Sequence, residues 1–127
     1  MTNKSKNTIG NFFEDFSINQ TLEHSTSRTI THGDSSLYTA LYGTRFALHS
    51  SNEFAKELKL EQSPIDDFLL FNIAFGKTVP DISLNALANL GYADCKFLKP
   101  VYPGDTIKSV SHVIGLKENS NGETGVV

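Results

Sequence analysis

The sequence has little of the chemistry that cross-links secreted proteins, holds metal ions or crosses membranes. Its 127 residues include one cysteine, Cys95, which excludes an internal disulfide framework and favours a reducing compartment. With one cysteine and no histidine pair at the spacing of helical metal ligands, we expect no metal site. No apolar run approaches the roughly 20 residues that span a bilayer. The four histidines are His24, His32, His49 and His112.

Charge and composition exclude further classes of protein. Eleven basic and 14 acidic side chains give a net charge of −3, so the chain lacks the broad basic surface that nucleic-acid binding needs. Hydrophobic residues make up 39% and charged residues 20%, which is typical of one globular domain. Residues 1–10 are polar, contain no secretory signal and predict a flexible arm. We therefore expect a cytoplasmic protein whose partners are neither nucleic acids nor membranes.

The first half of the chain predicts one strand and two short helices. Residues 21–31 are rich in threonine and serine and predict a strand with one exposed face. Asp34 favours an N-cap and Gly43 a C-cap of a helix whose apolar positions are Leu37, Tyr38, Leu41 and Tyr42. A second helix is predicted over 52–60, with three residues pointing inward: Phe54, Ala55 and Leu58.

The clearest helix start lies at residue 63. Ser63 can cap, Pro64 fits the first helical position, and the acidic pair Asp66 and Asp67 favours the positive end of the helix dipole. Residues 68–75, FLLFNIAF, are apolar almost all round, which predicts a helix buried on most sides. The residues expected to end it are Gly76 and Pro80.

The second half predicts strands. Residues 84–98 and 106–116 are strand-like, and Cys95 in the first of them is expected to be buried. Asn119–Gly122 indicates a hairpin turn, and Gly125–Val127 begin another strand at which the sequence stops. That ending suggests a fragment. Composition and spacing alone thus indicate an α+β domain with one buried helix.

Two segments carry a resemblance to a known family. FLKPVYPGDTI, residues 97–107, resembles the signature of MaoC-like hydratases, which have the hotdog fold. In that fold an antiparallel sheet wraps a mostly apolar helix, in agreement with the helix predicted at 64–75. LYGTRFALHSSNEFA, residues 41–55, is similar to the family motif Gly-Asp-x-Asn-Pro-aliphatic-His with an alanine six positions on. The matching residues are Gly43, Leu48, His49 and Ala55.

The segment from Asp66 to Thr106 resembles more narrowly the subfamily that interconverts mesaconyl-CoA and β-methylmalyl-CoA. Members of that subfamily carry two hotdog repeats in one chain. The resemblance therefore implies that residues 11–127 form the N-terminal repeat, truncated before its last strand or strands. Such a repeat is expected to dock on a second hotdog repeat or on a homodimer partner.

The family chemistry points to four positions here. Hydrating an enoyl thioester needs a base, an acid and donors to the thioester oxygen. In the family an aspartate and a histidine five residues apart form the acid/base pair, and backbone N–H groups at the head of the central helix serve the oxygen. His49 keeps the histidine position, but Thr44 stands at the aspartate position. Asp67 and Phe68 replace the family's His-Gly at the helix head. The resemblance thus implies a degraded site.

Some of these residues have simpler interpretations. His49 is equally well explained as a half-buried polar residue near a helix start. A register that places Asp34 on the motif's aspartate puts Thr39 at the histidine position and is rejected. Asp105 suits a turn. Three lysines are either CoA-phosphate contacts or, more simply, solvated side chains: Lys77, Lys96 and Lys99.

The function implied by the resemblance is reversible hydration of an enoyl-CoA, with mesaconyl-CoA as the expected substrate. This chain would be the degenerate, substrate-binding and structural half, inactive alone. The alternatives are a non-catalytic acyl-CoA-binding domain and a hotdog thioesterase, which would need a base of its own. No cofactor is implied, because CoA belongs to the substrate.

Overall fold

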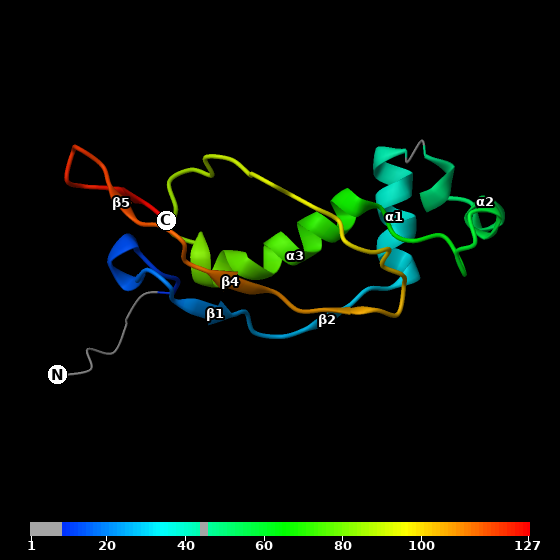
Figure 1. Ribbon diagram of the computed structural model, residues 1–127, viewed down its shortest axis with the longest axis horizontal. Helices are drawn as coiled ribbons and strands as arrows, with labels where there is room; N and C mark the ends of the chain where they lie inside the picture. Colours follow the sequence, from blue (N-terminus) through cyan, green and yellow to red (C-terminus); the bar gives the residue numbers. More distant parts are fainter. Residues whose placement is uncertain (1–8, 44–45) are drawn as a thin grey trace. The chain divides into compact units, whose positions relative to one another are not determined.

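The computed structural model describes residues 9–43 and 46–127 (Figure 1). The chain divides into two compact units. The described part of the first unit is residues 9–25, 76–91 and 109–127, and that of the second is 26–43, 46–75 and 92–108. No described helix is long and apolar enough to cross a membrane.

Helices and short strands alternate along the described chain. The helices are η1 (Phe13–Asp15), α1 (His32–Tyr42), η2 (Ala47–His49), α2 (Asn52–Glu57) and α3 (Asp67–Ile82), where η marks a 3-10 helix. The strands are β1 (Thr21–Glu23), β2 (Arg28–Thr29), β3 (Thr106–Ile107), β4 (Val110–His112), β5 (Lys117–Glu118) and β6 (Gly125–Val126). Helix α3 contributes its residues up to Phe75 to the second unit and the rest to the first.

The first unit contains two antiparallel strand pairs. Strand β1 lies beside β4, with Thr21 opposite His112 (Figure 1). Strands β5 and β6 form a hairpin. At its turn the Gly122 N–H donates to the Asn119 carbonyl over 3.0 Å, and Gly122 has a φ of +67°, which glycine adopts at little cost. The turn and the strand predicted after it are confirmed.

The second unit holds one strand pair and an aliphatic core. Strand β2 pairs antiparallel with β3. The core residues are Ile30, Ile65, Ile73 and Val101, with Leu69, Leu70 and Ile107 packed against them. The strands predicted over 21–31 and 106–116 are each divided into two short strands in the structure. Thr26 separates β1 from β2 because its φ of +60° cannot belong to a regular strand, and the predicted strand over 106–116 is divided into β3 and β4.

The start of α1 corrects one prediction. The N-cap is Thr31, whose hydroxyl accepts from the Asp34 N–H, and not Asp34 itself. Asp34 is the third helical residue, and its carboxylate accepts from the Thr31 N–H at 2.9 Å. The two residues form a reciprocal capping box, in which the acidic side chain satisfies the backbone donor of the cap residue. Gly43 ends the helix in the left-handed conformation, as predicted.

Helix α3 differs from the prediction at both ends. It begins at Asp67, because the Asp66 carboxylate and not Ser63 accepts from the first-turn N–H of Phe68. It continues through Gly76 and Pro80 to Ile82. Pro80 has no N–H to donate to the Gly76 carbonyl and its ring crowds that carbonyl, yet the helix runs on for two more residues.

The expected burial of α3 on most sides is also wrong for this chain. Of its residues only Ile73 is buried, and Phe68 is 66% exposed. Exposed apolar positions occur elsewhere too, since Leu58 on the expected inward face after α2 is 51% exposed while Ala55 is fully buried. The apolar pattern therefore marks surface that the described residues leave uncovered.

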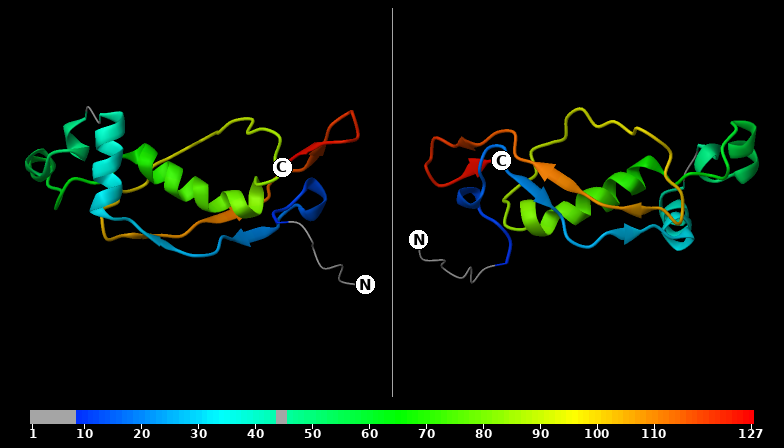
Figure 2. Two further views of the ribbon diagram at one scale, coloured as in Figure 1. Left: turned by 180° about the vertical axis from the view of Figure 1, so that it is seen from behind. Right: turned by 60° about the horizontal axis from the view of Figure 1, so that its bottom comes forward.

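The strand predicted over 84–98 does not form. This segment is irregular and drawn without a strand arrow in both views of Figure 2, and no described strand pairs with it. An extended segment without a partner has no hydrogen-bonded ladder to define it as a strand. Cys95 within it is exposed, which corrects the expectation of a buried thiol.

Replacing Asp34 with alanine should destabilise α1 by about 1 kcal/mol, because it removes half of the capping box and the pairing with Arg28. Hydrogen bonds from the Thr31 backbone and side chain, together with the Arg28 charge, hold the pKa of Asp34 below its ordinary value of 3.8. Its stabilisation is therefore present above that value and lost as the pH falls through the lower folded-state pKa.

Urea unfolding of the wild type, Asp34→Ala and Asp34→Asn between pH 2 and pH 6 measures this effect. Asparagine keeps an oxygen acceptor without the charge, so it should retain most of the cap and lose the pH dependence. Equal stability of wild type and Asp34→Ala at pH 6 would contradict the prediction.

Candidate functional site

His49 lies where its ring can contact a ligand. It ends η2 and is half-buried, with its ring edge-on to Phe46 at a centroid distance of 5.7 Å. Its Nδ1 lies 3.2 Å from the carbonyl oxygen of Pro64. A carbonyl only accepts, so Nδ1 carries the hydrogen and the neutral ring presents the lone pair of Nε2. His49 can accept a proton or a hydrogen bond at Nε2.

Two clefts in the second unit share His49. The smaller has a volume of about 310 Å³ and is mainly apolar, and we refer to it as the apolar cleft. Its walls are Phe46, Leu48, His49, Pro64, Asp67, Phe97, Leu98, Lys99 and Pro100. A cleft of this composition suits an acyl or other apolar chain, with His49, Asp67 and Lys99 as its polar side chains.

The larger cleft, of about 480 Å³, is lined mostly by hydroxyl and amide side chains. We refer to it as the hydroxyl-lined cleft. Helix α1 contributes His32, Ser35, Ser36 and Thr39 at i, i+3, i+4 and i+7, which places them on one helix face. This polar face was not predicted from the sequence, because the prediction for this helix rested on its apolar positions. The remaining walls include His49, Ser50, Asn52, Gln62 and Ser63.

The other predicted catalytic positions give a mixed result. Thr44 lies outside the described residues, so its role stays a prediction. Asp67 lines the apolar cleft with His49. The N–H of Phe68, which the resemblance assigned to the thioester oxygen, already donates to Asp66 Oδ1 at 2.8 Å. The Phe68 ring packs edge-on against Phe97 at 6.5 Å. As it stands, the head of α3 offers no free donor at Phe68.

The lysines and Asp105 behave largely as ordinary surface residues. Lys77 donates to the Ser25 carbonyl at 3.1 Å, and Lys96 is exposed. Only Lys99 lines one of the two clefts. Asp105 accepts from the Tyr102 N–H at 2.9 Å and its own N–H donates back to the Tyr102 carbonyl, in agreement with the predicted turn.

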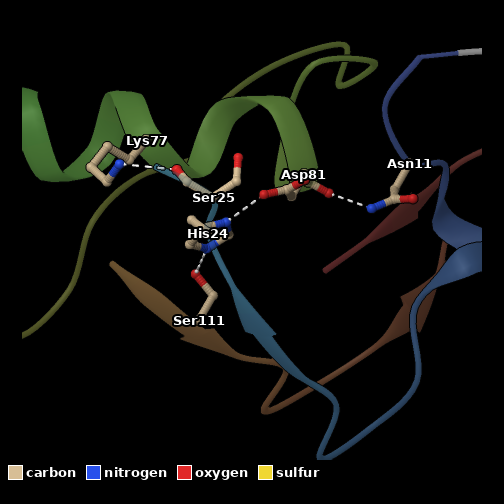
Figure 3. A network of polar contacts seen from close by, with 6 residues as sticks. All are labelled: Asn11, His24, Ser25, Lys77, Asp81 and Ser111. Atoms are coloured by element: carbon tan, nitrogen blue, oxygen red, sulfur yellow. Dashed lines mark hydrogen bonds and ion pairs between the residues drawn. The ribbon is translucent and has the colours of Figure 1, made fainter. Parts of the chain in front are cut away.

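The first unit contains a buried polar network that was not predicted from the sequence. His24, just after β1, contacts Asp81 Oδ2 through Nδ1 at 2.7 Å and Ser111 Oγ through Nε2 at 2.8 Å (Figure 3). Asn11 donates to the Asp81 carbonyl at 2.7 Å. The network joins α3 to the β1–β4 pair. No local signal reveals it, because its members lie 57 and 87 residues from His24.

The serine–histidine–aspartate order resembles a hydrolase triad, but its burial argues for a structural role. The His24 side chain has no exposed surface, and the member open to solvent is Asp81, whose side chain is 40% exposed. None of the three residues lines either cleft. A catalytic triad needs the opposite arrangement, with an accessible serine and a shielded acid. We interpret the network as a polar tether.

No group of three or more metal-ligating side chains occurs among residues 9–43 and 46–127. The chemistry available at the two clefts is that of the His32 and His49 imidazoles, the Asp67 carboxylate, the Lys99 ammonium group and a set of neutral hydrogen-bonding side chains.

Comparison with known sequences gives consistent matches. A family model described as "MaoC like domain" matches residues 14–127. The chain is 63% identical over 123 residues to beta-methylmalyl-CoA dehydratase of Chloroflexus aurantiacus, covering 97% of this chain and 35% of that protein. It is 56% identical over 122 residues to mesaconyl-CoA hydratase of Cereibacter sphaeroides, covering 96% and 36%. The chain thus spans little more than a third of the curated relatives it matches.

Solved structures agree with these matches. A MaoC domain protein dehydratase from Chloroflexus aurantiacus superposes with a TM-score of 0.91 at 62% identity, covering 95% of this chain and 35% of that one. A monoamine oxidase regulatory protein from Archaeoglobus fulgius superposes with a TM-score of 0.75 at 28% identity, covering 87% and 75%.

Removing the Ser111 hydroxyl should destabilise the first unit by about 1–3 kcal/mol, because Ser111→Ala leaves the buried Nε2 of His24 without its partner. His112→Ala is the matched control: His112 is on the same strand but is exposed, and its contact with Thr21 faces solvent, so the change should be within about 0.5 kcal/mol. Chemical denaturation measures both. Equal effects would contradict the tether.

The neutral form of His49 should be the Nδ1–H tautomer, since the Pro64 carbonyl accepts from that nitrogen. Long-range ¹H–¹⁵N correlation spectra of the imidazole distinguish the two tautomers directly. A predominant Nε2–H form at neutral ring charge would show that the Pro64 contact does not orient the ring.

Proposed function

This chain belongs to the MaoC-like domain family, and on that premise we propose that it is the acyl-CoA-binding half of an enzyme that adds water reversibly across an enoyl-CoA double bond. Family membership confirms the predicted hotdog fold. The curated relatives are named for mesaconyl-CoA and β-methylmalyl-CoA, which makes mesaconyl-CoA the proposed substrate. The proposed partner is a second hotdog repeat, in keeping with the 35% coverage of those relatives.

The observation that supports this function is the shared position of His49 on the two clefts. A substrate whose acyl chain occupies the apolar cleft brings polar atoms next to the imidazole. Nε2 of His49 can then accept a hydrogen bond from water or donate one to substrate once protonated. The ring is held for this by Pro64, so little entropy is lost when a ligand binds.

The acid/base pair of the reaction is proposed to lie elsewhere in the full gene product. Hydration needs a base that takes a proton from water as its oxygen bonds to the β-carbon, and an acid that delivers a proton to the α-carbon. Asp67 is the one acidic side chain in the walls of the two clefts, and it lies at the apolar one. Thr44, at the position of the family aspartate, has a hydroxyl that cannot act as a carboxylate base near neutral pH.

The test is hydration of mesaconyl-CoA by this chain and by the full gene product, followed by loss of the enoyl-thioester absorbance. We expect activity in the full product only. Activity in neither, with retained binding of acyl-CoA, would favour the non-catalytic binding domain. Activity of the isolated chain would place the complete acid/base pair here and overturn the assignment of a binding half.

His49→Ala in the full gene product separates binding from catalysis. For a binding role we expect KM to rise about tenfold with kcat within about threefold, because a uniform binding interaction has been removed. The control is His112→Ala, which lines neither cleft. A collapse of kcat at unchanged KM would instead make His49 a catalytic residue.

A further inference from the structure

The hydroxyl-lined cleft contains more hydrogen-bonding capacity than the chain itself uses. Among the described residues, no hydrogen bond engages the side chains of Ser35, Ser36, Thr39, Ser50 or Gln62. At an open surface, such unused hydrogen-bonding groups cost little, because they bond to water instead. Gathered around one cleft of about 480 Å³, the same groups form a convergent set of donors.

Ser63 is the residue of this set whose side chain is buried without a hydrogen-bond partner. Its Oγ is the one buried side-chain nitrogen or oxygen in the described chain without a hydrogen-bond partner. Leaving a hydroxyl buried and unpaired costs about 1–3 kcal/mol. Its backbone is fixed, since the Ser63 N–H donates to Asn52 Oδ1 at 2.9 Å. Because Ser63 also lines the cleft, a turn about its Cα–Cβ bond would bring this unpaired hydroxyl to a group that enters the cleft from outside.

The surroundings of the cleft are compatible with a negative group. Its walls contain two histidines and no carboxylate. His32 is the first residue of the 11-residue helix α1, whose N-terminal end carries partial positive charge. Asp34 lies in the same turn but does not line the cleft, and Arg28 pairs with its charge. Nothing acidic in the walls would repel an oxyanion.

We propose that the hydroxyl-lined cleft is an oxyanion-binding site, with the Ser63 hydroxyl as its buried donor. The inference rests on the proposed function for the source of the anion. An acyl-CoA with a dicarboxylic acyl group offers two: the free carboxylate of the acyl group and the phosphates of CoA. His49 lines both clefts, so a ligand in one of them lies close to the other.

The first experiment measures binding to this chain alone. Mesaconate, inorganic phosphate and adenosine 3′,5′-bisphosphate are titrated separately while ¹H–¹⁵N spectra are recorded, with dimethyl mesaconate as the neutral control. We expect saturable shifts at Ser35, Thr39 and Ser63 with at least one anion and none with the ester. Absence of saturable shifts with all three anions would overturn the proposal, as would equal shifts with the ester.

Ser63→Ala provides a signature that a purely structural serine would not show. Removing an unpaired buried hydroxyl should leave the melting temperature of the free protein unchanged or raised, while anion binding weakens about tenfold. Gln62→Ala is a second variant, and Ser120→Ala, in the exposed hairpin turn, is the control with unchanged affinity. Unchanged affinity in both cleft variants would overturn the proposal.

The source of the anion is tested in the full gene product. KM of Ser63→Ala is compared for mesaconyl-CoA and for crotonyl-CoA, which lacks the free carboxylate. A rise for mesaconyl-CoA alone assigns the cleft to the acyl carboxylate, and an equal rise for both assigns it to a CoA phosphate. Hydration with both KM values unchanged overturns the oxyanion site and leaves the proposed function. Anion binding without hydration supports the oxyanion site and overturns the proposed function.

Discussion

The candidate site depends on the backbone hydrogen bonds that hold two distant segments against the aliphatic core of the second unit. The Ile30 N–H donates to the Asp105 carbonyl, and the Gly104 N–H donates back to Ile30. Nearby, the Ile65 N–H donates to the Val101 carbonyl at 2.8 Å. Ile30 and Ile65 are the largest side chains buried completely, and the bond from Ile65 joins two buried residues, Ile65 and Val101.

Each functional group is attached to this framework within one or two residues. Pro64, which orients the His49 ring, precedes the core residue Ile65. Ser63, whose hydroxyl is buried, lies two residues before Ile65. Thr31, the cap of α1, follows the core residue Ile30 and so places the hydroxyl face of that helix. The core thus determines where the donors of the hydroxyl-lined cleft lie.

Much of the fold could be predicted where the determining contacts are local. Gly43 ends α1 and Gly122 makes the hairpin turn because both adopt positive φ. Glycine does so at little cost because it has no Cβ. The errors occur where several local solutions compete. Thr31, Asp34, Ser63 and Asp66 are all good caps, and only the position of the helix decides which of them accepts the N–H. The irregular segment over 84–98 shows the same limit, since an apolar alternating stretch becomes a strand only beside a partner.

By itself, the sequence determined the α+β class, the apolar central helix, the turns and the family, because each depends on residue type at short spacing or on a long run of matched residues. It also singled out His49. Only the tertiary structure decided which tautomer that histidine adopts, that the Phe68 N–H is occupied, and that His24 is tied to Asp81 and Ser111. The unpaired hydroxyl of Ser63 belongs to the same group. These properties depend on which atoms from distant parts of the chain come within hydrogen-bond distance, and no local pattern of residues encodes that distance.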